Sequence, residues 1–200
     1  MKIEYTQGAI SIENKIISNL DRFVLDFIRI LEKYTDYVIV SGYVPILFGR
    51  SRGTEDIDIL VKHFDKDVFT QFYDSLIKKD YYFLNPEKVY GLYEMLCDGL
   101  GIRAAKKDTI IPNVELKFVK NDFDNFSLGK KVKVVLGGKK YLFISPVELE
   151  IPYKLYLGSD KDIEDAVYLW DIFKDKIDLT VLNRFMNKMN VDGMNYGIGI

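Results

Sequence analysis

Apolar residues recur at helical spacing over three stretches in the first half of the chain. Between about Glu13 and Tyr34 they follow one another at steps of three, four and one, which is the stripe of an amphipathic helix that faces a core. Residues 66–79 repeat this spacing, and residues 88–97 show it more weakly. The pattern therefore predicts a helix over each of these stretches.

The last third of the chain is helical in pattern as well. Ser145, Pro146 and Glu148 form a typical helix entry, because serine caps the first turn, proline fits the first helical position and the acid completes a capping box. A short helix is also expected after Gly42, with Pro45 near its start. The predicted C-terminal helices lie within residues 146–157, 160–173 and 179–189.

Short apolar or alternating runs between the helices predict strands. Residues 36–42 contain a continuous apolar run, which is typical of a strand buried on both faces. In residues 56–62 every second side chain is Ile57, Ile59 or Val61, so the residues between them share the other face. Further strands are predicted at residues 102–106 and 113–119, and a hairpin at residues 130–144 around Gly137 and Gly138.

Together these elements predict an α+β (α/β) fold with a mixed β-sheet core, flanking helices and a helical C-terminal part. No internal repeat or long linker divides the sequence. We expect an α/β core over residues 1–144, a helical part packed on it over 145–190, and a loosely held tail over 191–200.

Composition and charge exclude several classes of protein. Of the 200 residues, 48% are hydrophobic and 29% are charged, so the chain has enough apolar side chains for a sizeable core. Its 28 basic and 30 acidic residues nearly cancel, which argues against a uniformly basic nucleic-acid-binding protein. The sequence has no apolar leader, no run of about 20 apolar residues and only one cysteine, Cys97. We expect a cytoplasmic protein without membrane contact, in which Cys97 is buried in its helix.

Asp56 and Asp58 are the clearest indication of chemistry in the sequence. Two residues apart on one strand, their carboxylates point to the same side with Cα atoms roughly 6.5 Å apart. Two anions in a poorly hydrated cleft repel each other, and a divalent cation relieves that repulsion. Oxygen ligands alone favour Mg²⁺ or Mn²⁺, and Mg²⁺ commonly shares its ligand shell with substrate phosphates. The pair therefore predicts a site for a metal-bound nucleotide.

Glu115 is the candidate for a third acid at this site. It alternates with Val114 and Leu116, so it projects from the face of its strand opposite the apolar set. If its strand neighbours residues 56–62, Glu115 joins the aspartates, and three carboxylates suit the two-metal chemistry of phosphoryl transfer. A surface glutamate paired with Lys117 is the alternative.

Ser41 and Gly42 are a small pair between a buried strand and a short helix. Such a pair lets backbone N–H groups approach phosphate oxygens, and the start of the helix adds positive potential. Tyr43 follows where a small residue might be expected, and it either narrows this approach or stacks on a base.

These residues together resemble a known superfamily. Their order is similar to the pattern of the nucleotidyltransferases with the DNA polymerase β fold: the small pair Ser41-Gly42, thirteen residues, the run Asp56-Ile57-Asp58, and a later acid on a strand. The resemblance implies a nucleotidyltransferase core in which Asp56, Asp58 and Glu115 are catalytic and hold Mg²⁺ or Mn²⁺. It also implies that Ser41 and Gly42 approach the triphosphate of an NTP.

A longer run of residues resembles more narrowly the small AbiEii toxin-like branch of this superfamily. Its residues here are Arg50, Arg52 and Thr54 before the acids, Lys154 on a later helix, and the run from Lys161 through Asp162 to Asp165. This branch implies transfer of a nucleoside monophosphate from an NTP to a hydroxyl of tRNA or protein, by the toxin of a toxin–antitoxin pair. It adds Arg50, Arg52, Thr54 and Lys154 as nucleotide-binding residues, and Lys161, Asp162 and Asp165 as auxiliary ones.

Several of these residues also have an ordinary structural interpretation. Lys154 either reaches a phosphate or extends from an apolar helix as a packed stem. Asp162 and Asp165 either orient Lys154 or simply favour the start of their helix. Arg50 and Arg52 either bind the β and γ phosphates or balance the acidic cluster.

The predicted hairpin carries a group of lysines, which has two interpretations. Lysines protect exposed strand edges from pairing with other chains, and lysines also bind RNA phosphates. The group consists of Lys130, Lys131, Lys133, Lys139 and Lys140.

The alternative function is a nucleotidyltransferase fold that has lost catalysis and serves as a binding or regulatory partner. Its sequence cue is the unusual Ser41-Gly42-Tyr43 junction.

Overall fold

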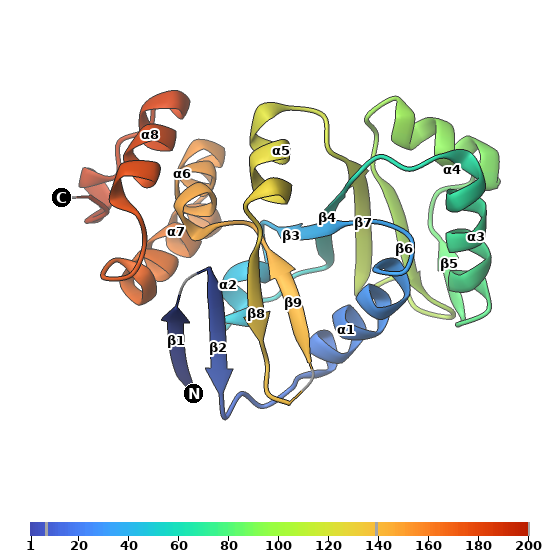
Figure 1. Cartoon of the computed structure of the whole chain (residues 1–200), viewed down its shortest axis with the longest axis horizontal. Coiled ribbons are helices and arrows are strands. Elements are labelled where there is room, and N and C mark those ends of the chain that lie inside the picture. The colour runs from blue at the N-terminus through green and yellow to red at the C-terminus, as the bar shows by residue number, and fades with distance from the viewer. Residues whose placement is uncertain (7, 139, 200) are drawn as a thin grey trace.

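The computed structural model describes residues 1–6, 8–138 and 140–199 (Figure 1). Over these residues, nine strands form one mixed sheet in the order β1-β2-β8-β9-β3-β4-β7-β6-β5. The strands are β1 (Lys2–Thr6), β2 (Ala9–Glu13), β3 (Tyr37–Val40), β4 (Asp56–Val61), β5 (Tyr81–Phe83), β6 (Ile102–Lys106), β7 (Asn113–Phe118), β8 (Val132–Val135) and β9 (Tyr141–Ile144).

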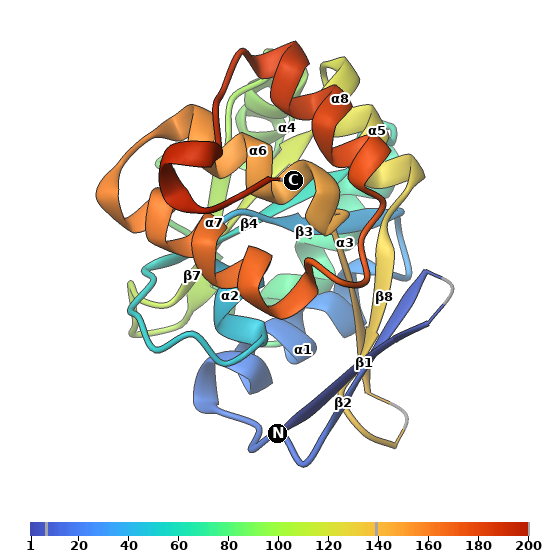
Figure 2. The same cartoon turned by 90° about the vertical axis from the view of Figure 1, so that its left-hand side faces the viewer.

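Helices cover the sheet and form one end of the molecule. The C-terminal helices pack on one another at that end, on the left in Figure 1 and towards the viewer in Figure 2. None of the helices in the described ranges is both long and apolar enough to cross a membrane. The helices are α1 (Asn19–Leu31), α2 (Tyr43–Leu47), α3 (Lys66–Ile77), α4 (Val89–Cys97), α5 (Asp122–Gly129), α6 (Val147–Leu157), α7 (Asp160–Phe173) and α8 (Leu179–Met189). The predicted α+β class with a mixed sheet and a helical C-terminal part is confirmed.

The centre of the sheet carries the candidate chemistry. Strand β4 pairs antiparallel with β3 and parallel with β7, so β7 and β3 flank it on either side. Burial alternates along β4 as predicted, because Ile57, Ile59 and Val61 lie in the core while Asp56 and Asp58 are partly exposed. This alternation directs both aspartates away from the core.

The N-terminal part of the chain differs from its predicted structure. The helix predicted from Glu13 begins at Asn19, and strands β1 and β2 precede it. Ser18 sets the true start, because its side chain accepts a hydrogen bond from the backbone N–H of Asp21 and the Asp21 carboxylate accepts one from the N–H of Ser18. The predicted helix therefore extended over the connection at residues 14–18, and strands β1 and β2 were not predicted.

The basic hairpin exists, but it is not an edge of the sheet. Strand β8 pairs parallel with β2, and β9 pairs parallel with β3, so both hairpin strands lie inside the sheet. Edge protection by Lys130, Lys131 and Lys133 is therefore wrong as an interpretation. Lys131 instead pairs with Asp36 of the neighbouring segment. Lys139 lies outside the described residues.

Two local predictions about helices are also wrong. Pro146, not Ser145, stands at the N-cap of α6, and the Ser145 hydroxyl bonds with that of Ser127 at 3.0 Å. The Glu148 carboxylate accepts the backbone N–H of Asp178 at 3.1 Å and closes no capping box. Cys97, the last residue of α4, is exposed and not buried.

The tail after residue 190 contains one short 3-10 turn, Met194–Tyr196, and the side chain of Ile198 is 1% exposed within the main core. The division of the chain at residue 144 and the looseness of the tail stay predictions.

Candidate functional site

The three predicted acids meet at the centre of the sheet. Asp58 of β4 and Glu115 of β7 are register partners on adjacent parallel strands, and Asp56 lies two residues before Asp58 on the same face. Parallel neighbours place their side chains side by side on one face of a sheet. The expectation that Glu115 joins the aspartates in space is therefore met.

Two basic side chains neutralise this group of acids. The Lys117 ammonium lies 2.6 Å from the Glu115 carboxylate and 4.0 Å from that of Asp58. The Arg103 guanidinium lies 3.4 Å from Glu115 and 3.8 Å from Asp56. The predicted Glu115–Lys117 pair thus exists within the cluster of acids and does not replace it. Arg103 had no signal in the sequence, because its role depends on the pairing of β6 with β7.

The protonation of the acids reflects their crowding. Burial raises the pKa of Asp58 to about 6, and a hydrogen bond shared with Glu115 raises it further against the opposing charge of Lys117. Burial also acts to raise the pKa of Glu115, but its hydrogen bond and charge interaction with Lys117 outweigh burial and lower it. One proton shared between two carboxylates is the expected result of placing them together without a divalent cation.

The chemistry of this donor set fits a hard divalent cation. Its donors are carboxylate oxygens from Asp56, Asp58 and Glu115, the ligand type that Mg²⁺ and Mn²⁺ prefer. Among the described residues, no group of three or more His, Cys, Asp or Glu side chains is already arranged to hold a metal ion. Lys117 and Arg103 instead supply positive charge next to these carboxylates, where a bound metal would supply it.

Ser41 and Gly42 form the turn between β3 and α2, beside the acids. Ser41 has a backbone φ of 64°, the left-handed conformation that glycine adopts most easily. A Cβ on Gly42 would meet the end of the Arg52 side chain and lie 3.3 Å from the Thr54 hydroxyl, so any larger residue here would displace the Arg52 guanidinium. Thr54 in turn donates to the backbone carbonyl of Asp56 at 2.8 Å and ties its loop to the start of β4.

Tyr43 takes neither of the roles considered for it. Its side chain is fully buried, and its hydroxyl donates to the Asp21 carboxylate of α1 at 2.7 Å. Burial and the neighbouring carboxylate raise its pKa well above the ordinary value. Tyr43 therefore anchors α2 in the core, away from any ligand at the turn.

The auxiliary residues of α6 and α7 form a buried ionic cluster. The Lys154 ammonium and the Asp165 carboxylate are both 0% exposed and lie 2.8 Å apart, and Asp162 lies 3.4 Å from the same ammonium. Arg50 and Arg52 approach Asp165 from the other side, at 2.6 and 3.2 Å. Asp165 thus faces three cations. The orienting role considered for Asp162 and Asp165 agrees with their contacts to Lys154. Arg50 and Arg52 pair with Asp165 of α7, whereas the cations beside Asp56, Asp58 and Glu115 are Lys117 and Arg103.

Glu150 was missed by the sequence analysis. It lies on α6 with a residue exposure of 3%, and its two carboxylate oxygens accept the Ser41 backbone N–H at 3.1 and 3.3 Å. Burial raises its pKa to about 7 against the lowering effects of Lys154 and the Ser41 N–H. The available signal was an acid between Leu149 and Ile151, in a helix whose neighbouring positions are apolar.

Two cavities meet at this site. One, of about 820 Å³, lies on the side of Gly42 and Arg52, and Thr54, Lys161 and Asp162 also line it. The other, of about 270 Å³, lies beneath β4 and β7, between α5 and α6. They share Ser41, Asp58 and Leu157 as lining residues. Ser41 of the turn and Asp58 therefore stand at the junction of the two cavities, while Asp56 lines the larger one and Glu115 lines neither.

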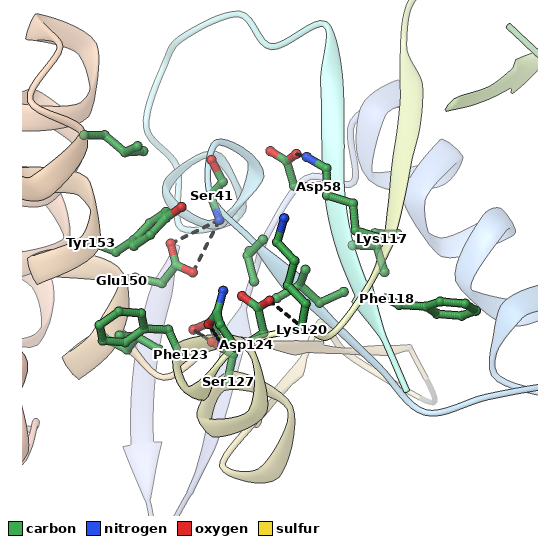
Figure 3. A pocket seen from close by; sticks show the side chains of 17 residues that line it. Ser41, Asp58, Lys117, Phe118, Lys120, Phe123, Asp124, Ser127, Glu150 and Tyr153 are labelled. Carbon is green, nitrogen blue, oxygen red and sulfur yellow. Dashed lines mark hydrogen bonds and ion pairs between the residues drawn. The ribbon is translucent and has the colours of Figure 1, made fainter. Parts of the chain in front are cut away.

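The smaller cavity is drawn in Figure 3. Ser41 and Glu150 lie on one side of it and Asp58 with Lys117 on the other, while Tyr153 points its hydroxyl towards Ser41. Lys120 extends into the space between them. The smaller cavity therefore has the Ser41 turn on one wall and one of the three acids, Asp58, on the other.

Comparison with known proteins bears on the fold. No protein-family model matches the chain, and no curated protein matches it in sequence. It is similar to the solved structure of an antigenic nucleotidyltransferase-like protein from Paracoccidioides brasiliensis, with 17% identity, a TM-score of 0.50, and coverage of 84% of this chain and 86% of that one. It is also similar to the antibiotic-resistance factor ANT(2'')-Ia, with 12% identity, a TM-score of 0.53, and coverage of 91% of this chain and 98% of that one. The chain therefore has a nucleotidyltransferase-like α+β fold.

Proposed function

We propose that the chain is a metal-dependent nucleotidyltransferase, which moves a nucleoside monophosphate from an NTP to an acceptor hydroxyl with release of pyrophosphate. The observation that carries this proposal is the register of Asp58 with Glu115 on adjacent strands, with Asp56 on the same face. The glycine turn beside these acids and the nucleotidyltransferase-like fold support it.

Asp56, Asp58 and Glu115 would hold Mg²⁺ or Mn²⁺. When bound, the metal polarises the phosphate under attack and lowers the pKa of the attacking hydroxyl. Because the pKa of Glu115 is lowered while that of Asp58 is raised to about 6, Glu115 is the acid that stays ionised, and Asp58 holds a proton only below about pH 6 in the metal-free protein. Loss of that proton accompanies metal binding.

The larger cavity suits the triphosphate. Gly42 lets the backbone approach phosphate oxygens, and Arg52 with Lys161 supplies positive charge on its wall. Arg52 is held by Asp165 at 3.2 Å, so its position is set before a ligand arrives. We assign Arg50 and Lys154 to positioning, because Asp165 engages both of them and, unlike Arg52, neither lines the larger cavity.

The acceptor and the biological setting are also part of the proposal. The resemblance to the AbiEii toxin-like branch favours a tRNA or protein hydroxyl as acceptor, in a cytoplasmic toxin that pairs with an antitoxin protein. What supports the branch is the buried contact between Lys154 and Asp165, since the two residues that carry the resemblance are also partners in space.

A second candidate function is a nucleotidyltransferase fold without catalysis that acts as a binding or regulatory partner. The observation that favours it is the neutralisation of the acids by Lys117 and Arg103, which leaves less need for a metal. Calorimetry with each NTP in Mg²⁺ and in EDTA separates the two functions. Heat that requires Mg²⁺ supports the enzyme, and no heat with any NTP supports the binding partner.

The direct test of the proposed function is Asp58→Asn. This change keeps the size of the side chain but removes a metal-binding charge, so Mg²⁺-dependent NTP binding and transfer of labelled NMP into cellular RNA or protein should be lost. The matched control is Asp74→Asn, at an exposed position on α3 that lines neither cavity of the site. Unchanged metal-dependent binding in the Asp58 variant would contradict the proposal.

A further inference from the structure

The turn at Ser41 adopts a conformation that its own residue type does not favour. Its φ of 64° is left-handed, and a residue with a Cβ enters this region only with support from its surroundings. The backbone carbonyl of Ser41 accepts the N–H of Val44 at 3.2 Å and so begins α2. Support for this turn must therefore come through the remaining backbone group, the Ser41 N–H.

Glu150 supplies that support from a different part of the chain. Both oxygens of its carboxylate accept the Ser41 N–H, and the residue is 3% exposed. Figure 3 shows this pair of bonds at the wall of the smaller cavity. A hydrogen bond that is shielded from water is electrostatically stronger than one in water.

Glu150 is itself fixed by other buried polar groups. The Ser145 side chain acts to lower the pKa of Glu150 and so favours its ionised form, and the Ser145 hydroxyl lies 3.0 Å from that of Ser127 on α5. Both serines are buried. This connected polar network determines the position of the carboxylate, and through it the position of the turn.

We propose that Glu150 is a positioning residue for nucleotide binding: its carboxylate holds the Ser41–Gly42 turn in its left-handed form through the Ser41 N–H. The turn then presents Ser41 and Gly42 to the larger cavity, which both residues line. Glu150 itself lines only the smaller cavity, so it acts on the nucleotide through the turn and not by contact. This inference rests on the proposed function for the identity of the ligand.

Two substitutions at Glu150 separate the hydrogen bond from the volume of the side chain. Glu150→Gln keeps a carbonyl that can accept the Ser41 N–H, whereas Glu150→Met keeps the length of the side chain without an acceptor. We expect the Met variant to bind NTP with Mg²⁺ at least tenfold more weakly by calorimetry, a loss of about 1.4 kcal/mol. The Gln variant should stay within threefold of the wild type.

The matched control is Glu148→Met, on the same helix. Glu148 is also buried and also accepts a backbone N–H, but its partner is Asp178 and lies away from the turn. This variant loses a comparable buried hydrogen bond, so its melting temperature should fall while its affinity for NTP stays that of the wild type. A purely structural role for Glu150 predicts that both methionine variants behave alike.

A second change tests whether the turn is the target. Glycine adopts a positive φ without strain, so Ser41→Gly should restore part of the affinity that Glu150→Met loses. If the Met variant binds NTP within twofold of the wild type, or if it weakens binding no more than the Glu148 control does, the inference is overturned.

Measurements on the wild type keep the inference distinct from the proposed function. If the wild type binds no NTP, the proposed function fails, but amide hydrogen exchange still tests the contact. The Ser41 amide should exchange as slowly as the amides of β3 if Glu150 holds it. Fast exchange at Ser41 overturns the inference, whether or not any variant folds.

Discussion

Asp165→Asn is the substitution that most directly tests the buried ionic cluster. Asp165 is 0% exposed and lies 2.6, 3.2 and 2.8 Å from Arg50, Arg52 and Lys154. Asparagine has nearly the same size, so the change removes one charge and leaves the packing intact. Lys154, also 0% exposed, then keeps only Asp162 at 3.4 Å as a partner.

The magnitude follows from the burial of Lys154. Removing one partner of a buried ion pair leaves an uncompensated charge in a poorly hydrated place and costs about 3–5 kcal/mol. For a chain of this size each kcal/mol lowers the melting temperature by about 2–4 °C, so the expected decrease is about 6–20 °C. The free energy of unfolding measured by urea denaturation should fall by the same amount, about 3–5 kcal/mol, and its dependence on urea concentration should keep the same slope.

The control is the neighbouring residue on the same helix. Glu164 lies 2.6 Å from the same Arg50, but its side chain is 66% exposed. Exposed ion pairs contribute about 0–1 kcal/mol, so Glu164→Gln should change stability very little. If the Asp165 variant is no less stable than the Glu164 variant, burial does not govern the cluster and this reasoning is refuted.

Two further changes address the acids of the site. Lys117→Gln removes the cation that lies 2.6 Å from the Glu115 carboxylate, so calorimetry should show Mn²⁺ binding the nucleotide-free protein about tenfold more tightly. Weaker binding of Mn²⁺ would show that Lys117 does not compete with the metal. Burial raises the pKa of Glu150 from 4.5 to about 7, so its contribution to stability is fully present below pH 4.5 and is lost as the pH rises through 7. The free energy of unfolding of the wild type, measured relative to Glu150→Gln, should therefore fall by about 3 kcal/mol between pH 4 and pH 8, and a constant difference would contradict this assignment.

The strands of the site could be predicted because local alternation dictates them. In β4 and β7 the apolar residues alternate with acids, so the facing of Asp56, Asp58 and Glu115 follows from a period of two. The pairing of β4 with β7 did not follow from this pattern. The meeting of Glu115 with the aspartates was expected only on the condition that the two strands are neighbours. Which strands are neighbours is decided by the whole sheet and not by either strand alone.

The N-terminal strands show where local reasoning failed. Ile10 and Ile12 are buried at the spacing of a strand, yet the apolar pattern of the helix that follows extends towards them. Only the cap at Ser18 separates the two elements, and a cap is visible in sequence only as a serine with an acid three residues on. Strand β9 lies between β8 and β3, but β8 is an interior strand only because β2 pairs with it, so missing β2 left β8 as an apparent edge.

The partners of buried charges were the least predictable part of the site. Glu150 lies in the first turn of α6, where acids are favoured in any case, so its apolar neighbours were a weak signal of burial. Asp165 lies beyond the first turn of α7, in a run that also contains Asp160, Asp162 and Glu164, and nothing local distinguishes it from these acids. Their partners are more than 100 residues away along the chain, since Glu150 meets Ser41 and Asp165 meets Arg50. Such contacts arise from the docking of the C-terminal helices on the sheet and not from any local pattern.

These two carboxylates explain how the C-terminal helices contribute to a site whose acids they do not carry. From α6, Glu150 holds the beginning of the segment between β3 and β4, at Ser41. From α7, Asp165 holds the later part of the same segment, at Arg50 and Arg52. A loop is ordered only when its contacts outweigh the conformational entropy that ordering costs. The pairing of β4 with β7 places the three acids. Both anchors of the segment come from the helices after residue 145, so these helices place the turn and the arginines.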